Sequence, residues 1–344
     1  MEEVRETKII IPLSKCVSGM RLLQPIIDEK MGTVLLPRGS VLNNENISRI
    51  KSFDHNCVCV EIKTESMLLK HRAEDIKAYE SYSDSLRYIL KPQVDIQKID
   101  IDEVKKIAKS LVNTFENNIS ALACVNIINQ LSKDCYTHSL NVAIIAIVIG
   151  RWNDYSDDKL EKLALSGLLH DVGKLEELTF KTETEIEAKL KDRLSYRRHP
   201  IASYEKLVQF NELDIDVLKA VLTHHERCDG SGFPLSLRGE RISDMAKIIG
   251  LADTYERLRQ KMHIFDVIKE LRSTSMGGFD IDLLINFCTN VMNYYIGAHV
   301  LLSTGEVAEV EYIQSHSLYR PIVKTRSRSV DLYLQTHIKI DKVY

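Results

Sequence analysis

Residues 116–293 carry the feature that most constrains the fold: apolar residues recur there at helical spacing, segment after segment. In DDKLEKLALSGLLHD, the apolar positions follow one another at steps of three, one and four residues: Leu160, Leu163, Ala164 and Leu168. Because an α-helix turns once in about 3.6 residues, this spacing places the side chains on one face that must be buried. We therefore expect a mainly α protein with an all-helical domain over residues 116–295.

The segments on either side of this domain have a different residue pattern. Residues 1–63 contain short β-prone runs, such as KIIIPL and CVCVEI, which are broken by Gly, Pro and Asn. Residues 296–344 again predict strands, as in AHVLLSTGEVAEVEYI, where a Thr-Gly pair marks a turn. Residues 64–115 are polar with a helical period. We expect a small N-terminal β-rich module for regulation or dimerisation, a helical connector, the helical domain and a β-rich tail.

Composition and charge argue against several classes of function. The net charge of −3 gives no electrostatic case for nonspecific binding of DNA or RNA. The longest apolar run, VAIIAIVIG at residues 142–150, is too short to span a bilayer. The seven cysteines are scattered and odd in number, which favours free thiols in a reducing cytosol. We therefore expect a cytoplasmic protein without a membrane span, and a homodimer is one arrangement that the N-terminal module would allow.

Imidazole and carboxylate groups gather in the helical part of the chain. The stretch LLHDVGK places His170 and Asp171 side by side, and YRRHP places His199 before Pro200, a residue that can begin a helix. Taken alone, the His-Asp pair also fits a buried histidine beside a capping aspartate. The full ordered set is His138, His170, Asp171, His199, His224, His225 and Asp253. Imidazole with carboxylate is a ligand set for iron, manganese or zinc. Seven groups exceed what one tetrahedral ion takes, and they suit two metals about 3.5–4 Å apart that share a bridging carboxylate.

The order of these groups resembles the HD-GYP branch of the HD-domain metal-dependent phosphohydrolases. The resemblance covers residues 130–290 and rests on THSLNVA, HDVGK, RRHP, HHERCDGSGFP, IIGLAD and GGFDIDLLINF. It implies a phosphodiesterase that hydrolyses the bacterial second messenger cyclic di-GMP. It also implies that the seven groups bind two divalent transition metals, or three, with Fe or Mn as the first choices. Asp134, one helical turn before His138, could add an acidic ligand, since some family members use a Glu thereabouts for a third metal.

The expected chemistry fits the residues independently of the resemblance. Hydrolysis of an inert phosphodiester needs a strong nucleophile, and a water that bridges two metals is acidified enough to serve as hydroxide. We expect Asp171 to be the bridging carboxylate. Lys174, about one turn later, can reach a phosphate oxygen or the leaving oxygen, although a solvated lysine at a helix end is the alternative. Arg197 and Arg198 stand before His199, where one could contact phosphate or both could form an exposed charged face.

The loop DGSGFP follows directly on two of the candidate ligands. Gly232 permits close approach of a ligand or another loop, and Phe233 stands where the family usually has Tyr. We expect both residues to form a wall of the substrate site.

Two other segments depart from the family pattern. After Asp253, the segment TYERLRQKMHIF has no arginine at the position where family members use one to bind the substrate's guanine and phosphate. Arg257, Arg259 and Lys261 lie nearby, and Lys261 is a candidate substrate contact. The segment after Lys174 lacks the family's usual Pro and Gly and predicts a charged helical cap. We therefore expect the chain to hydrolyse a phosphodiester, while the identity of the substrate stays open. It could be cyclic di-GMP or another nucleotide, and a catalytically weak cyclic di-GMP receptor is a further alternative.

Overall fold

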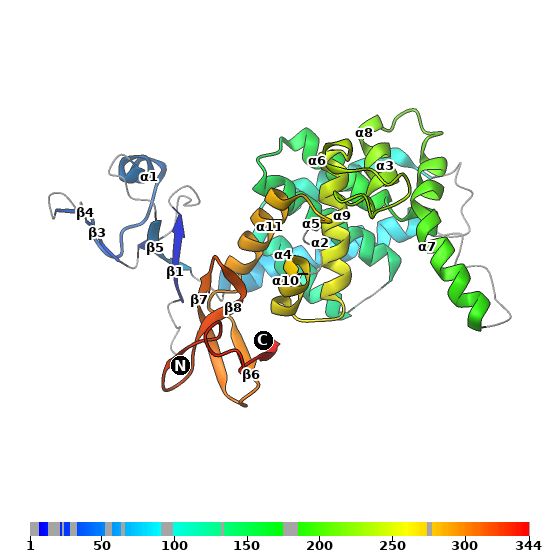
Figure 1. Cartoon of the computed structure of the whole chain (residues 1–344). Helices are drawn as coiled ribbons and strands as arrows, with labels where there is room; N and C mark the ends of the chain where they lie inside the picture. The colour runs from blue at the N-terminus through cyan, green and yellow to red at the C-terminus, as the bar shows by residue number, and fades with distance from the viewer. Residues whose placement is uncertain are drawn as a thin grey trace. The chain divides into compact units, whose positions relative to one another are not determined.

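The chain folds into two compact units, Met1–His71 and Arg72–Tyr344, as a computed structural model shows (Figure 1). Helices dominate the larger unit, and antiparallel sheets occur near both ends of the chain, so the expected mainly α class is confirmed. The structure describes residues 7–12, 21–22, 24–27, 33–51, 57–62, 66–90, 99–131, 134–174, 185–273 and 277–343.

The smaller unit contains the β-prone runs of the N-terminal sequence. Strands β1 (Thr7–Pro12), β5 (Cys57–Ile62) and β2 (Arg21–Leu22) form an antiparallel sheet in that order. Strand β3 (Ile26–Ile27) pairs with β4 (Val34–Leu36), and helix α1 covers Asn44–Lys51. Their small apolar core consists of Leu22, Ile26, Leu42, Ile47 and Ile50. The smaller unit thus has its own sheets and its own apolar core.

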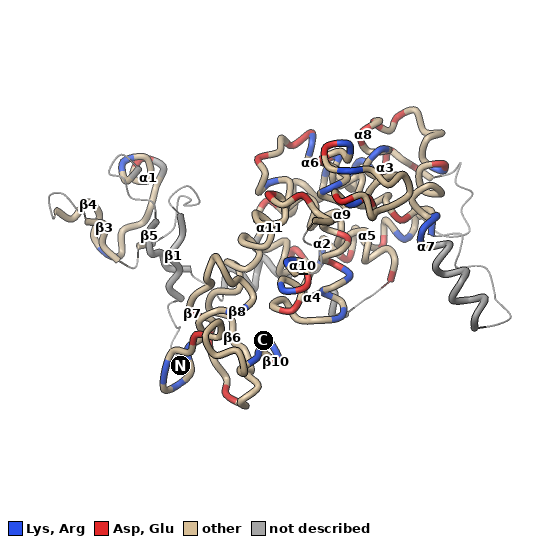
Figure 2. Tube along the Cα trace, in the orientation of Figure 1, with Lys and Arg blue, Asp and Glu red and all other residues tan. Residues whose placement is uncertain are grey.

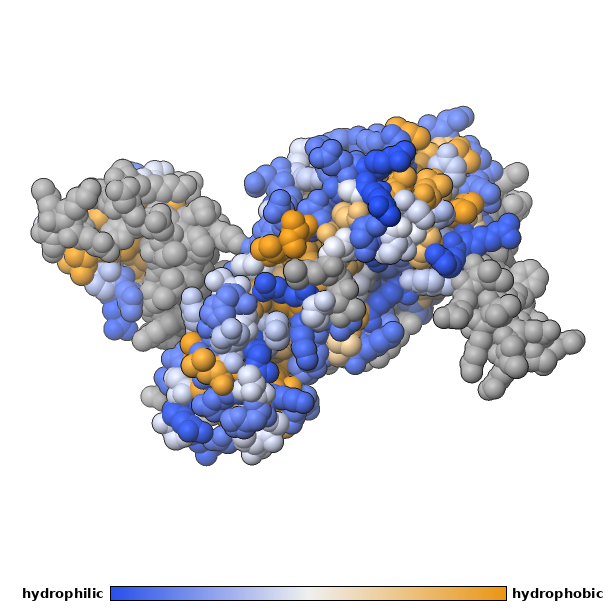
Figure 3. All heavy atoms as spheres, viewed as in Figure 1, coloured by the Kyte–Doolittle hydropathy of each residue, from blue (hydrophilic) through white to orange (hydrophobic). Residues whose placement is uncertain are grey.

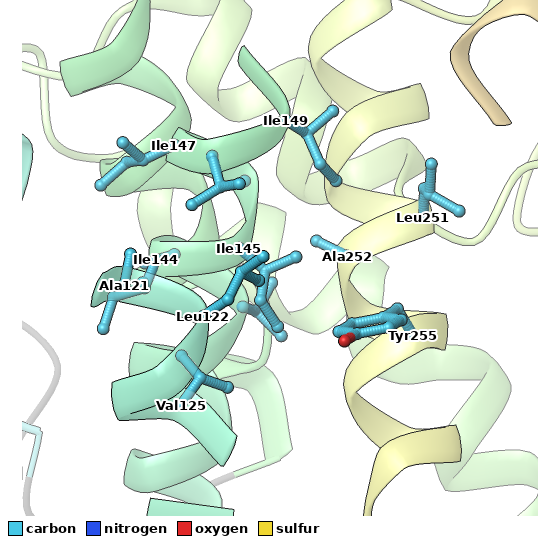
Figure 4. Packing of buried hydrophobic residues seen from close by; sticks show 14 of the residues in the cluster. Ala121, Leu122, Val125, Ile144, Ile145, Ile147, Ile149, Leu251, Ala252 and Tyr255 are labelled. Carbon is cyan, nitrogen blue, oxygen red and sulfur yellow. The ribbon is translucent and has the colours of Figure 1, made fainter. Parts of the chain in front are cut away.

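The larger unit is built around helix α5 (Cys135–Trp152). Each residue of α5 from 137 to 150 is buried, as expected for a helix that is apolar on all sides. Figure 4 shows Ile145 and Ile149 on the side of α5 toward Ala252 and Tyr255 of α9, and Ile144 beside Ala121 of α4. Burying each large apolar side chain contributes about 1.5–3 kcal/mol, so this contact fixes α5 and α9 firmly against each other.

The other helices have the following bounds: α2 (Ser66–Ile89), α3 (Ile101–Thr114), α4 (Asn118–Leu131), α6 (Asp157–Leu169), α7 (Glu185–Leu207), α8 (Ile215–Thr223), α9 (Asp244–Arg259), α10 (Ile264–Ser273) and α11 (Ile281–Asn293). Of these, α3, α4, α6, α9 and α11 pack against α5. A short 3-10 turn, η3 (Val172–Lys174), follows α6. The periodic leucines of α6 are buried, as their spacing predicts. Helices α6 and α9 each pack against both α5 and α8, which brings distant parts of the sequence together.

The C-terminal tail forms the five-stranded antiparallel sheet β10-β6-β7-β8-β9. Its strands are β6 (His299–Leu302), β7 (Val307–Gln314), β8 (Ser317–Lys324), β9 (Ser329–Asp331) and β10 (Ile340–Val343). Gly305, with a φ of +82°, makes the predicted turn between β6 and β7. Strand β8 packs on α10 and α11, and buried residues of the sheet, such as Val310 and Val323, belong to the same core as the helices.

The described surface of the larger unit is mixed in character. Basic and acidic residues alternate along the helices drawn in Figure 2. In the view of Figure 3, apolar side chains form small groups among hydrophilic ones. The exposed apolar residues include Ile281 and Ile285, one turn apart on α11. Among the described residues, no helix is both long and apolar enough to cross a membrane.

Candidate metal centre

The seven candidate ligands lie together, although they come from five different helices or their ends. They are His138 near the start of α5, His170 and Asp171 at the end of α6, His199 in α7, His224 and His225 at the end of α8, and Asp253 in α9. All seven side chains are more than nine-tenths buried. Burial of so many polar groups in one place is costly unless they bind one another or a cation, so this cluster needs a chemical explanation.

Two glycines allow the segments that carry the ligands to approach so closely. A Cβ atom at Gly250 of α9 would collide with the backbone carbonyl of His224. A Cβ atom at Gly173 would lie 2.5 Å from the carbonyl oxygen of His199. Any side chain at either position would push a histidine-bearing segment away from the centre.

The ligand atoms form two groups that meet at Asp171. The groups are His138, His170 and Asp171, and His199, His224 and His225, with ligand atoms in each group within 4.8 Å of one another. Oδ2 of Asp171 lies 3.6 Å from Nε2 of His138 and 3.4 Å from Nε2 of His170. Oδ1 of Asp171 lies 3.1 Å from Nε2 of His199. The carboxylate therefore presents one oxygen to each group, which is what a bridging ligand requires.

Asp253 has a similar two-sided arrangement. Its Oδ1 lies 3.0 Å from Nε2 of His138 and 3.7 Å from Nε2 of His170. Its Oδ2 lies 4.0 Å from Nδ1 of His225. Asp253 thus adds negative charge mainly to the group that contains His138.

Backbone carbonyls fix the orientation of three of the imidazole rings. Nδ1 donates to a carbonyl oxygen in His170 (to Gly167, 2.8 Å), His199 (to Tyr196, 2.6 Å) and His224 (to Val221, 2.7 Å). A carbonyl oxygen can only accept, so Nδ1 carries the hydrogen and Nε2 keeps its lone pair. This arrangement holds the rings in the form that binds a metal through Nε2.

Several of the inward-facing atoms have no hydrogen-bond partner among the described residues. They are Nε2 of His170, Nε2 of His225 and Oδ1 of Asp171, all fully buried. Buried polar atoms normally have a partner, so lone pairs that converge at one point fit the binding of a cation. The residues therefore fit a site for metal ions.

Helix α7 passes through Pro200, and the expectation that a helix begins there was wrong. Proline has no N–H, so the carbonyl of Tyr196, four residues earlier, loses its usual helical partner. That carbonyl accepts the Nδ1–H of His199 instead. The proline thus frees the acceptor that orients a candidate ligand.

Burial and neighbouring charges keep most of the candidate ligands in the protonation state that binds metal. Burial alone would raise the pKa of Asp171, but His170 and Lys174 hold it well below the usual range. The pKa of Asp253 is likewise held well below the usual range, against burial, by Arg257 and by its hydrogen bonds with histidines. Burial lowers the pKa of His225 to about 2. Charged carboxylates and neutral imidazoles are the forms that bind metal.

His138 differs because two carboxylates surround it. Burial lowers its pKa, but hydrogen bonds with Asp253 and Glu256 outweigh burial and raise the pKa to about 9. The two carboxylates therefore stabilise a proton on the His138 ring, and a metal bound at Nε2 would replace that proton.

Three predicted substrate contacts lie beside the cluster. Nζ of Lys174 lies 2.5 Å from Oδ2 of Asp171. The ring of Phe233 stacks on that of His225, with centroids 4.7 Å apart. The guanidinium of Arg197 lies over the Phe233 ring at 5.3 Å. These side chains border the centre on the side of α7 and the DGSGFP loop.

Gly232 and Glu226 shape that loop from within. A Cβ at Gly232 would collide with the backbone of Glu226 and Arg227, so the glycine permits the tight fold of the loop. The carboxylate of Glu226 accepts hydrogen bonds from the backbone N–H groups of Leu235 (2.6 Å) and Leu237 (2.9 Å). Glu226 thereby ties the loop to the end of α8.

Other predicted site residues lie elsewhere. Asp134 caps α5 by accepting from the N–H of Thr137 (2.8 Å), and it pairs with Arg87 (2.5 Å), so its carboxylate belongs to neither ligand group. Arg198 is exposed, and Lys261 is exposed in the turn after α9, eight residues beyond Asp253. The first part of the predicted helical cap, residues 175–184, lies outside the described residues.

Sequence reasoning missed two residues of α9 that reach the cluster. Oε2 of Glu256 lies 2.5 Å from Nδ1 of His138. Nε of Arg257 lies 2.7 Å from Oδ1 of Asp253. Residues three and four positions apart on a helix share a face, and that spacing from Asp253 was the available signal.

Comparison with known proteins agrees with this picture. Residues 122–273 match the family model of the HD domain. The chain is 29% identical over 215 residues to the cyclic di-GMP phosphodiesterase PA4108 of Pseudomonas aeruginosa, covering 59% of this chain and 50% of the relative. It is 27% identical over 209 residues to the 3'3'-cGAMP-specific phosphodiesterase 1 of Vibrio cholerae, covering 58% of this chain and 44% of the relative. The chain thus spans about half the length of these curated relatives.

A solved structure supports the fold. The HDG"Y"P protein Bd1817 of Bdellovibrio bacteriovorus superimposes with a TM-score of 0.52 at 16% identity, covering 83% of this chain and 99% of that protein. The helical fold, the buried His and Asp cluster and the family match lead to one conclusion: residues 122–273 of this chain form an HD domain.

Proposed function

We propose that this chain is a metal-dependent phosphodiesterase that hydrolyses a cyclic dinucleotide, with cyclic di-GMP as the first substrate to test. One observation carries the proposal: Asp171 presents one oxygen to each of two buried groups of histidine ligands. The name of the Pseudomonas aeruginosa relative supports cyclic di-GMP as the substrate.

The ligand groups suit two divalent metals. His138, His170, Asp171 and Asp253 would hold one ion, and His199, His224, His225 and Asp171 would hold the other. Nitrogen and carboxylate donors without thiolate favour Fe or Mn. When bound, such a pair supplies an activated water at neutral pH and offsets negative charge on the phosphate.

The side chains around the ligands would bind and orient the substrate. Lys174 contacts the same Asp171 oxygen that faces His138 and His170, so its ammonium is placed to donate to a phosphate oxygen. Phe233 and Arg197 contact each other beside His225 and would form the wall that the dinucleotide meets. Gly232 keeps that wall close to the end of α8, while the exposed Arg198 and Lys261 would reach only outer parts of the substrate.

The test is turnover by the full chain, prepared without oxygen and loaded with Fe²⁺ or Mn²⁺. We expect hydrolysis of cyclic di-GMP, detected by chromatography, and its loss when a chelator removes the metal. A protein that holds two metals per chain but hydrolyses no cyclic dinucleotide would overturn the proposal. Binding of cyclic di-GMP without turnover would then favour the receptor alternative.

A different cyclic dinucleotide is the second candidate substrate. One of the two curated relatives described above is named a 3'3'-cGAMP-specific phosphodiesterase, and the segment after Asp253 departs from the family pattern. A panel of cyclic di-GMP, 3'3'-cGAMP and cyclic di-AMP, compared by kcat/KM on one preparation, separates the two candidates. A cytoplasmic location, a homodimer and a regulatory role for the N-terminal β-rich module stay predictions.

A further inference from the structure

Arg257 occupies the part of the centre where one of the two metals would bind. Its Nε lies 2.7 Å from Oδ1 of Asp253. Its Nη2 lies 3.2 Å from Nε2 of His138 and 3.3 Å from Oδ2 of Asp171. One guanidinium therefore contacts three ligand atoms, and all three face the same metal position.

These contacts and a metal ion exclude each other. Nδ1 of His138 is engaged by Glu256, so Nε2 is the ring nitrogen whose lone pair a metal can use once it carries no proton, and the guanidinium contacts the same atom. A transition metal binds an imidazole nitrogen at about 2.0–2.1 Å along that lone pair. A guanidinium nitrogen at 3.2 Å from the same atom would overlap with such an ion, so one of the two cations must leave.

The side of the centre formed by three histidines differs in its contacts with cationic side chains. Buried atoms without a hydrogen-bond partner among the described residues occur on both sides: Oδ1 of Asp171 and Nε2 of His225 here, and Nε2 of His170 on the side of Arg257. The cation contacts of Asp171 that the structure shows, from Lys174 and Arg257, both go to Oδ2. Within the described residues, Lys174 and Arg257 contact ligand atoms of the position at His138 only, and this distinguishes the two metal positions.

We propose that Arg257 is a placeholder cation, meaning a side chain that neutralises one metal position until the ion displaces it. The position formed by His199, His224, His225 and Asp171 fills first, and the position at His138, His170 and Asp253 fills second. The displaced guanidinium can turn toward solvent, because about one third of the Arg257 side chain is exposed (34%). This inference rests on the two-metal site proposed above.

The experiment is a titration of metal-free protein with Mn²⁺ alone, in which electron paramagnetic resonance counts the free ion. In the wild type we expect two unequal sites, with the second ion bound at least tenfold more weakly. In Arg257→Ala the second ion should bind about tenfold more tightly than in the wild type, a difference of roughly 1.4 kcal/mol. Arg259→Ala is the matched control, because Arg259 lies on the same helix but donates to Asn126 and to the carbonyl of Met262.

Arg257→Lys separates a placeholder from a simple charge effect. Lysine keeps the positive charge but replaces the planar fork of donors with a single ammonium. It cannot reproduce the three contacts, so the second ion should bind more tightly than in the wild type.

Several results would overturn the inference. An Arg257→Ala protein whose second ion binds no more tightly than in the wild type would contradict it while leaving the two-metal site intact. Equal second-ion affinity in Arg257→Lys and the wild type would assign the effect to charge alone. Absence of Mn²⁺ binding in the wild type and in Arg257→Ala would defeat the proposed function as well.

Discussion

Asp171 directs its two carboxylate oxygens to different histidine groups, and its Oδ1 lies 3.1 Å from Nε2 of His199. Its other oxygen, Oδ2, faces His138 and His170 at 3.6 and 3.4 Å. A carboxylate in this position can fix the separation of two cations and offset part of their charge. These are tasks that no ligand of a single metal performs.

Asp171→Asn should therefore remove metal as well as activity. The amide keeps the size of the side chain but offers a neutral oxygen that bridges poorly. We expect the loss of at least one metal per chain and nearly all phosphodiesterase activity, while the helical fold survives on its buried α5 and α6 core. Metal analysis, turnover and circular dichroism on one sample provide the measurement. A fully metallated and active variant would refute the bridging role, and an unfolded one would make the cluster structural.

Lys174→Ala should separate binding of the metals from catalysis. Its ammonium contacts a carboxylate oxygen of Asp171 but is not itself a ligand, so metal content should stay near the wild-type value. Turnover should fall at least tenfold, which corresponds to roughly 1.4 kcal/mol of transition-state stabilisation. Lys219→Ala is the control, because Lys219 is an exposed lysine of α8 that pairs with Asp216. Unchanged turnover in Lys174→Ala would place this lysine among the solvated residues of the helix end.

The sequence was sufficient for the fold class and for the order of the candidate ligands. Residue patterns are local properties: helical spacing predicts the buried leucines of α6, and the β-prone runs predict the strands of the tail. The seven His and Asp groups could be selected because their residue types and order are distinctive. Their proximity in space follows from the packing of five helices and could be expected only from the resemblance.

Contacts that depend on packing lay beyond sequence reasoning. Arg257 had an acidic residue one turn earlier, but its approach to His138 depends on how α9 packs against α5. Pro200 was misread because prolines usually interrupt helices, whereas here the side chain of His199 satisfies the freed carbonyl. Asp134 lies one turn before His138 in sequence, yet a helix cap and Arg87 engage its carboxylate.

Gly250→Ala should destabilise the protein, although alanine normally favours a helix over glycine by about 1 kcal/mol. The added Cβ would collide with the carbonyl of His224, and both segments are buried, so neither can move freely. Crowding in a packed interior costs about 1–3 kcal/mol. We expect a lower Tm and weaker metal binding, measured by calorimetry with and without Mn²⁺. An increase in Tm would mean that α9 and the end of α8 are less tightly packed than the structure shows.

Glu256→Gln should weaken metal binding although it replaces none of the candidate ligands. Oε2 of Glu256 accepts from Nδ1 of His138 and so holds the ring with Nε2 toward the centre. Glutamine keeps the shape but removes the negative charge that makes the imidazole a stronger donor, and such partners typically change metal affinity about 10–100-fold. We expect a loss in that range, measured by Mn²⁺ titration against a chelator. Gln260→Ala is the control, because Gln260 donates to Oε1 of the same carboxylate and leaves the His138 contact in place. If Glu256→Gln bound Mn²⁺ as tightly as the control, the carboxylate would serve packing alone. Packing between α5 and α9 would then fix the orientation of the His138 ring.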